Sequence, residues 1–323
     1  MELRALRYFQ TVAEFGSLSR ASEFLRISQP AVSRQIRKLE TELGRRLFTR
    51  HGHGVSLTEA GRRLLEHGQR VLRQLEQARD EVRGDAKGPS GIVTLAVAPA
   101  AGYYLVPALV ERVARELPDV QLKIVGGFSG YIHEWLVRGQ VDLACLHDPL
   151  PRRGFEIAPL VAEPVFLVGK PDDTRFAAGH ARIEDLARLP LILPSRPNAS
   201  RRMLDSWVAR RRITPNIVME VDDHSIIRAL IRRGIGFSLL TQCAIADDVA
   251  AGKLQAWPIR PAVAWQLALV GSTELLRSEL AGAVAESVRA VMRDLTSSGA
   301  WPGLPRAKAR RRPARLNFAP FSS

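Results

Sequence analysis

The 323-residue sequence is poor in cysteine: it has two, Cys145 and Cys243, and each lies within an apolar run. Two cysteines cannot build a disulfide framework or a cysteine-rich metal cluster, so we expect both to be small buried hydrophobic residues. The chain also lacks an apolar run long enough to span a membrane, and its first residues do not form a signal-peptide pattern. These absences predict a cytoplasmic protein.

Motifs of catalysis are missing as well. Gly127-Phe128-Ser129-Gly130 is followed by Tyr131, where a Gly-x-Ser-x-Gly nucleophile elbow requires glycine. The sequence has no glycine-rich phosphate loop, and the pair His51 and His53 has no third metal ligand nearby. We therefore expect no enzyme activity, no cofactor and no metal site; an enzyme fused to a DNA-binding domain is the remote alternative.

Positive charge is concentrated at the two ends of the chain. Of the formal net charge of +14, residues 1–90 contribute +6, from 17 Lys and Arg against 11 Asp and Glu. Residues 296–323 contribute another +6 without any acidic residue, which leaves +2 for residues 91–295. A basic N-terminal end fits a nucleic-acid partner, because phosphate neutralisation dominates affinity for nucleic acids. We interpret 296–323 as a disordered basic tail.

Residues 17–38 (SLSRASEFLRISQPAVSRQIRK) predict two short helices joined by a tight turn. Their apolar residues recur every three or four positions, the spacing of a helix with one buried face. These residues are Ala21, Phe24 and Leu25 in the first helix and Val32, Ile36 and Leu39 in the second. We expect the Ser28 hydroxyl to cap the second helix, and Pro30 is tolerated in its first turn.

The second helix presents polar and basic side chains opposite its apolar stripe. They are Gln29, Ser33, Arg34, Arg37 and Lys38. Hydrogen-bonding groups near the helix start and positive charge along its length suit a helix that enters the major groove of double-stranded DNA. The pattern favours a helix-turn-helix; a solvated helix in a small bundle is the alternative.

Two short extended segments follow, at 45–50 and 55–57, around the turn His51-Gly52-His53-Gly54. A glycine-rich hairpin directly after a recognition helix is typical of a wing, which places basic side chains near the DNA backbone or minor groove.

A long helix is predicted from Thr58, which serves as its cap. Its apolar positions alternate in steps of four and three, as in a heptad seam of roughly three repeats. They are Leu64, Gly68, Val71, Leu75, Ala78 and Val82. The charged flanks favour a projecting helix that pairs with a second copy, although a core helix of one domain would show the same stripe. Residues 84–91 then break the periodicity and mark a linker.

From residue 92 onward, strands and helices alternate. Strands are predicted at 92–98, 120–125 and 141–146, and the same alternation recurs up to a last helix at 274–295. Alternation of this kind builds a parallel sheet covered by helices. The fold class is therefore α/β after an all-α N-terminal part, and we expect two lobes with a ligand cleft where strand ends meet helix starts.

A set of specific motifs runs through residues 1–295. They are Ala21, Ser28-Gln29-Pro30-Ala31-Val32-Ser33, Ile36, Leu43-Gly44, Leu47-Phe48-x-Arg50 and Val55-x-Leu57-Thr58-x-Ala60-Gly61, then Leu105-x-Pro107, Leu117-Pro118-x-Val120 and Leu136-x-x-Gly139-x-Val141-Asp142-Leu143-Ala144. In this order they resemble the LysR-type transcriptional regulators, a family without catalytic activity. Gly126–Ser129 and Pro194–Pro197 are most similar to its nitrogen-assimilation and sulfur regulators.

The resemblance implies a winged helix-turn-helix at 1–58, a dimerising linker helix and hinge at 59–90, and an effector-binding domain at 91–295. It implies an effector domain like periplasmic binding proteins, with lobe one at 91–161 plus 267–295 and lobe two at 162–266. Members are commonly homodimers or homotetramers that act on promoters when a small, often anionic, molecule binds in the cleft. RNA polymerase is a candidate partner.

By the same resemblance, Gln29, Pro30, Ser33 and Arg34 face bases and phosphates, while Lys38 and Arg50 contact the DNA backbone. The wing position usually held by Arg is His53 here, so insertion into the minor groove is expected to be weaker near neutral pH, where His is mostly uncharged.

Helix starts supply the candidate effector contacts, because they present free N–H groups and the positive end of the helix dipole. The candidates are Ala100, Ala101, Ser129, Ser195, Asn198, Ser200 and Thr241. Ser and Asn at helix starts are often only caps. Related proteins often have Ser or Thr where this chain has Ala100, so an effector-independent DNA-binding regulator is the alternative.

Overall fold

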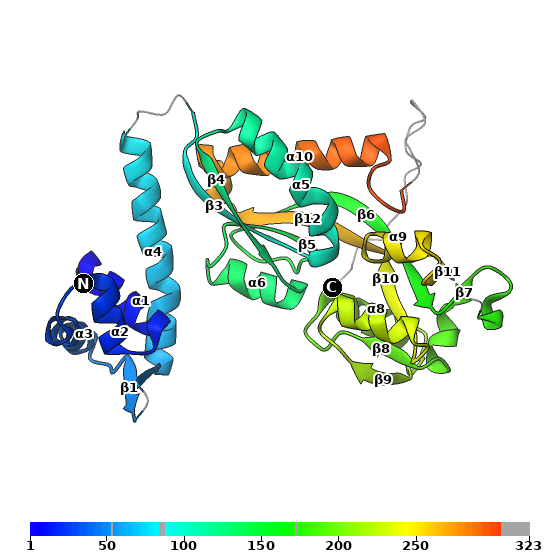
Figure 1. The fold of residues 1–323 in the computed structure, drawn as a ribbon, viewed down its shortest axis with the longest axis horizontal. Helices are drawn as coiled ribbons and strands as arrows, with labels where there is room; N and C mark the ends of the chain where they lie inside the picture. The colour runs from blue at the N-terminus through cyan, green and yellow to red at the C-terminus, as the bar shows by residue number, and fades with distance from the viewer. Residues whose placement is uncertain (53, 84–87, 172, 305–323) are drawn as a thin grey trace. The chain divides into compact units, whose positions relative to one another are not determined.

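The computed structural model describes residues 1–52, 54–83, 88–171 and 173–304 (Figure 1). The N-terminal part is helical apart from one hairpin, as the sequence predicts. Its elements are α1 (Leu3–Phe15), α2 (Leu18–Leu25), α3 (Gln29–Leu43), β1 (Phe48–His51), β2 (Gly54–Leu57) and α4 (Glu59–Arg83). One apolar core joins α1, α2, α3, the hairpin and the first turns of α4, so these segments form one packed domain.

The predicted burial of Phe24 in α2 is wrong. Its side chain is 67% exposed, and its ring packs on Phe15 with 5.2 Å between the ring centroids. Ala21 and Ser22 are the buried residues of this short helix. The Ser22 hydroxyl donates to the Ser19 carbonyl at 2.7 Å, which lets a polar residue take the inward position.

The predicted side-chain cap at Ser28 is also wrong. Ser28 occupies the N-cap position of α3, yet its hydroxyl makes no capping hydrogen bond. Its backbone carbonyl closes the first turn instead, accepting from the N–H groups of Ala31 and Val32 at 2.9 and 3.2 Å. The helix therefore begins where the sequence predicts, but by a backbone bond.

The hairpin after α3 is antiparallel, and Phe48 pairs with Leu57 at its base. Gly54 has φ of 137°, and a Cβ there would lie 2.3 Å from the carbonyl oxygen of Gly16. This close approach requires glycine. The next residue, Val55, donates its N–H to the same Gly16 carbonyl at 2.9 Å, which fixes the hairpin to the turn between α1 and α2. His53 lies outside the described residues.

Thr58 caps α4, as the sequence predicts. Its hydroxyl oxygen accepts from the Gly61 N–H at 3.0 Å and donates to the Arg46 carbonyl at 2.7 Å. Its N–H donates to the Leu47 carbonyl at 2.9 Å. The start of α4 is thus bonded to the segment that leads into the hairpin.

The first half of the predicted heptad seam packs inside the domain. Leu64 contributes to the N-terminal core, and a Cβ on Gly68 would lie 2.7 Å from a methyl carbon of Leu6 in α1. Val71 is 41% exposed. The side chains of Ala78 and Val82 lie outside the described part of α4. The alternative of a core stripe therefore holds for the segment that faces α1.

The chain groups into two compact units. One comprises 1–98, 113–157 and 270–285, and the other comprises 99–112, 158–269 and the residues from 286 onward. Each unit is described by itself below.

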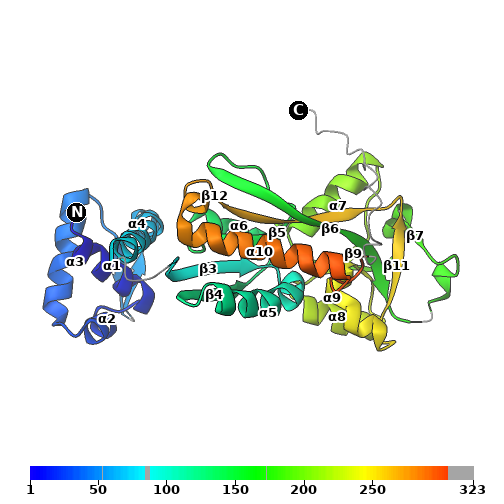
Figure 2. The same ribbon diagram turned by 90° about the horizontal axis from the view of Figure 1, so that it is seen from above.

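Beyond the N-terminal domain, the first unit contains a parallel sheet, as predicted. β3 (Gly91–Val97) pairs with β4 (Val120–Gly126) and with β5 (Leu143–His147) (Figure 2). α6 (Ser129–Val137) packs its buried Ile132 and Leu136 against this sheet.

The second unit departs from the predicted parallel sheet. Its longest strand, β6 (Phe155–Gly169), pairs antiparallel with β10 (Ser238–Thr241) and β11 (Gln255–Arg260). The smaller pairs β11 with β7 (Ala181–Arg182) and β8 (Leu191–Leu193) with β9 (Ile217–Glu220) are parallel. The sheet is mixed because β6 pairs antiparallel with strands that come much later in the chain. A local sequence pattern does not reveal such distant pairing.

The helices of this part are α5 (Pro99–Glu116), α7 (Ala199–Arg210), α8 (His224–Arg232), α9 (Gln242–Ala250) and α10 (Glu279–Ser298); the remaining elements are strand β12 (Ala264–Ser272) and the short 3₁₀ turns Thr174–Phe176, Ile183–Ala187 and Leu275–Arg277. α5, β12 and α10 run through the boundary between the two units. Among the described residues, no helix is both long and apolar enough to cross a membrane.

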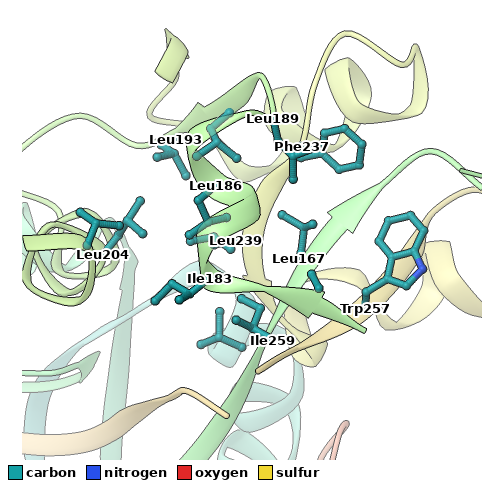
Figure 3. Packing of buried hydrophobic residues seen from close by; sticks show 14 of the residues in the cluster. Leu167, Ile183, Leu186, Leu189, Leu193, Leu204, Phe237, Leu239, Trp257 and Ile259 are labelled. Carbon is teal, nitrogen blue, oxygen red and sulfur yellow. The ribbon is translucent and has the colours of Figure 1, made fainter. Parts of the chain in front are cut away.

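The core of the second unit is aliphatic with one aromatic cluster (Figure 3). Phe176, Phe237 and Trp257 lie with ring centroids 4.6 to 6.3 Å apart. Gly169, at the end of β6, makes room for them: a Cβ there would lie 2.4 Å from the ring of Phe237. Around the cluster pack leucine and isoleucine side chains such as Leu167 and Leu239.

We expect Gly61→Ala to destabilise the N-terminal domain by about 1–3 kcal/mol, the usual cost of overpacking. A loss of stability would be the reverse of the usual effect, because alanine ordinarily stabilises a helix by about 1 kcal/mol relative to glycine. Here the added Cβ would lie 2.1 Å from the Leu47 carbonyl oxygen. Thermal unfolding followed by circular dichroism, with hydrogen exchange to locate the loss, measures the effect.

The matched control is Gly126→Ala, where a Cβ meets no atom within 4 Å. It should change stability by no more than about 0.5 kcal/mol. A Gly61→Ala variant as stable as the wild type would contradict the tight junction between α4 and the hairpin.

Candidate functional site

The polar side of α3 carries the residues expected to face DNA. Two rows run along it in steps of four: Gln29, Ser33 and Arg37, and beside them Pro30, Arg34 and Lys38. All are exposed except Ser33, which is half-buried. Val32, Ile36 and Leu39 are buried on the opposite side. The structure therefore brings the six predicted α3 residues onto one accessible surface, which we call the DNA-facing side of α3.

The hairpin is held against α3 by one carboxylate. Oε1 of Glu40 accepts hydrogen bonds from the N–H groups of Leu47 and Phe48 at 2.8 and 3.3 Å. Arg50, on β1, then reaches α3: its guanidinium donates to the Ser33 hydroxyl at 3.3 Å. The predicted backbone contact Arg50 thus lies next to the DNA-facing side of α3.

The cations on this side differ in their pairing. Lys38 Nζ lies 2.6 Å from Glu2 Oε1, and this hydrogen-bonded pair raises the pKa of Lys38 and lowers that of Glu2. Both side chains are exposed, so the pair exchanges readily with solvent or phosphate. The side chains of Arg34 and Arg37 make no ion pair with any described residue. They are therefore available to a polyanion without breaking an internal bond.

Three of the predicted effector residues, Ser195, Asn198 and Ser200, make internal hydrogen bonds. Ser195 donates both its N–H, at 3.0 Å, and its hydroxyl to the carboxylate of Asp222. Oδ1 of Asn198 accepts from the N–H and hydroxyl of Ser200 at 2.9 and 2.7 Å, which caps α7. These three residues lie together. The interpretation as a helix cap holds for Asn198, whereas Ser200 lies in the first turn of α7 and donates to that cap.

The other candidates are buried or half-buried. Ala101 and Thr241 are 0% and 2% exposed. Ala100 is half-buried and packs on an apolar cluster of the second unit that includes Ile192 and Ile227. Ser129 is the first residue of α6 in the first unit and is 9% exposed.

The charged partners of the 194–200 loop are not evident from the sequence. Arg201 is 6% exposed and donates to the Pro194 carbonyl at 3.2 Å and to Glu220 at 2.6 Å. Asp222 holds Ser195 from the segment before α8. The local sequence signal for the bond to Ser195 is the consecutive pair Asp222-Asp223. Because Asp223 alone is enough to cap α8, the other aspartate is free to bond elsewhere.

Neither cysteine has the properties of a reactive thiol. Burial raises the pKa of the Cys145 thiol to about 12 and raises that of Cys243 as well. Thiols of this kind are poor nucleophiles and poor metal ligands at neutral pH. In the part of the chain described here, no three His, Cys, Asp or Glu side chains gather into a metal site.

Two protein-family models match the chain. Residues 3–62 match the bacterial regulatory helix-turn-helix protein, lysR family, and residues 86–293 match the LysR substrate binding domain. The second match alone covers more than half of the chain.

Individual proteins agree with these matches. The HTH-type transcriptional regulator BbuR of Bordetella bronchiseptica is 35% identical over 93% of both chains. The nitrogen assimilation regulatory protein nac of Escherichia coli is 31% identical over 90% of this chain and 95% of its own. Among solved structures, a full-length OxyR variant from Pseudomonas aeruginosa superposes with a TM-score of 0.71 at 26% identity, covering 91% of this chain and 97% of that one.

The matched families and named relatives are transcriptional regulators, not enzymes. The all-α DNA-binding part and the following α/β domain are the architecture that these matches share. The chain therefore belongs to the LysR family of transcriptional regulators, with an N-terminal helix-turn-helix and an effector-binding domain.

Proposed function

We propose that this regulator binds promoter DNA through the DNA-facing side of α3, with Gln29, Pro30, Ser33 and Arg34 toward bases and Arg37, Lys38 and Arg50 toward the backbone. The observation that carries the proposal is the exposed guanidinium of Arg34, which pairs with no described residue and lies in the first half of α3, the half of a recognition helix that usually contacts base edges. Arginine is the commonest specific contact to guanine. His53, which the sequence analysis assigns to the wing, belongs to the same proposal.

We further propose that the division drawn from the sequence describes the working parts: 1–58 for DNA, 59–90 for pairing and hinge, 91–295 for the effector with lobes 91–161 plus 267–295 and 162–266, and 296–323 as a basic tail. Pairing through α4 is supported by Val71, which is 41% exposed on a helix whose first turns pack on the domain core. Two paired domains would contact two half-sites. A homotetramer and contact with RNA polymerase extend this proposal.

The effector is proposed to be a small, anionic molecule bound in the 91–295 domain, with contacts drawn from Ala100, Ala101, Ser129, Ser195, Asn198, Ser200 and Thr241. Helix N-termini at α5, α7 and α9 support an anion. Asp222 opposes it at one point: an anion that contacts Ser195 must displace or protonate this carboxylate.

An effector-independent regulator is the second candidate. It is favoured by Ala100, which has no hydroxyl to offer and packs on the apolar cluster of the second unit.

Arg34→Ala is expected to cost about 1–3 kcal/mol of binding to the cognate operator and much less on random duplex, because a base contact carries sequence information. The operator is first obtained by sequencing DNA fragments that the full chain retains. Affinities are then compared by fluorescence anisotropy at one fixed salt concentration. Arg188→Ala, which removes an exposed arginine of the second unit, is the matched control and should leave both affinities unchanged. Equal loss on both DNAs would show that Arg34 contacts only phosphate.

A small-molecule effector should raise the thermal midpoint of the full chain. A ligand present at a hundred times its dissociation constant adds about 2.7 kcal/mol to stability. The measurement is differential scanning fluorimetry against sulfate, small carboxylic acids and amino acids. The Arg34→Ala variant should show the same shift, since its substitution lies in the DNA-binding part. If no compound moves the midpoint, the effector-independent alternative replaces the proposal.

A further inference from the structure

A pocket of about 540 Å³ lies between the C-terminal half of α3 and the hairpin. Its lining residues are Leu18, Ile36, Arg37, Glu40, Thr41, Gly44, Arg45, Arg46, Phe48, Arg50 and Val55. We call it the arginine pocket. All of these residues belong to the N-terminal domain, so the pocket is complete within one packed unit.

The charge in the arginine pocket is strongly unbalanced. Four arginines line it, Arg37, Arg45, Arg46 and Arg50, against the single acidic residue Glu40, which leaves a formal charge of +3. That carboxylate already accepts two backbone N–H groups of the hairpin. A concave surface with cations in excess raises the local concentration of anions.

The arginines have few internal partners. Among the described residues, the side chains of Arg37, Arg45 and Arg46 form no ion pair and no hydrogen bond, and the guanidinium of Arg50 donates only to the neutral Ser33 hydroxyl. Thr41 turns its hydroxyl to the Arg37 carbonyl of its own helix at 2.9 Å. The donors of the pocket therefore remain open to a ligand.

The backbone that carries Arg45 and Arg46 is fixed. The Arg45 N–H donates to the Glu40 carbonyl at 3.1 Å, and the Arg46 carbonyl accepts from the Thr58 hydroxyl at 2.7 Å. The following residue, Leu47, is bonded to the Glu40 carboxylate. The side chains of Arg45 and Arg46 therefore extend from a backbone segment that is already fixed. This preorganisation lowers the entropy cost of binding an anion.

We propose that the arginine pocket binds phosphate, and that Arg45 and Arg46 hold a phosphodiester of the operator backbone beside the segment contacted by α3. The inference rests on the proposed function, because Arg37 and Arg50 belong both to this pocket and to the proposed DNA contacts. That continuity favours the DNA backbone over a free phosphate compound as the source. Guanidinium groups match the geometry of phosphate oxygens by paired N–H···O bonds.

The test is the salt dependence of DNA binding by the full chain. Each lost phosphate contact reduces the magnitude of the slope of log K against log salt concentration by about one. The magnitude of this slope should therefore be smaller by about two for the Arg45→Gln/Arg46→Gln variant. The variant should also bind operator and random duplex more weakly by the same factor. Arg62→Gln/Arg63→Gln is the matched control: it removes two exposed arginines of the same domain that lie on α4 and pair with Glu59. Its slope should stay at the wild-type value.

Inorganic tripolyphosphate, added at constant ionic strength, distinguishes the source of the phosphate. Competition with DNA for the wild type but not for Arg45→Gln/Arg46→Gln means that the pocket also accepts free phosphate compounds. No competition, with the slope change present, assigns the pocket to the DNA backbone alone. An unchanged slope, or equal slope changes in both double variants, overturns the proposal. The Arg34→Ala variant distinguishes failure of this proposal from failure of the proposed function. Its expected loss of sequence specificity tests base contact by α3 and does not involve the arginine pocket.

Discussion

The carboxylate of Glu40 connects α3 to the hairpin, and the proposed DNA-binding surface depends on this connection. Because it accepts the N–H groups of Leu47 and Phe48, the hairpin cannot change its angle to α3 without leaving a carboxylate and two amides unpaired. Losing such a charge-assisted pair costs more than a typical neutral hydrogen bond contributes. Arg50 reaches Ser33 only because the strand that carries it starts from this fixed point.

Much of the N-terminal domain could be predicted from the sequence, because its signals are local. Helix periodicity, the cap at Thr58 and the glycines of the turns each act within a few residues. The errors there are local too. Phe24 fits the helical stripe by spacing, but Ala21 and Ser22 are the buried residues of this two-turn helix, and Phe24 is 67% exposed.

The second unit was less predictable because its partners are distant in the chain. β6 pairs with strands about 70 and 90 residues later, and nothing in its own sequence indicates an antiparallel neighbour. The candidate site shows the same limit. Ser195 is a reasonable anion donor by composition, yet its donors are taken by Asp222, 27 residues further on. The basic pair Arg45-Arg46 is visible in the sequence, whereas the pocket that gathers it with Arg37 and Arg50 is not.

The first turns of α4 belong to the same core as α1, α2, α3 and the hairpin. Thr58 bonds the helix start to the hairpin base, and Gly68 allows it to lie directly on Leu6. The DNA-binding surface is consequently a rigid body with α4 as its lever. In the proposed dimer, a signal that arrived along α4 would turn that body as a whole and leave the shape of α3 intact. Regulation would then act on the distance and angle between two such bodies, and so on which spacing of half-sites is bound, while the preferred bases stay the same.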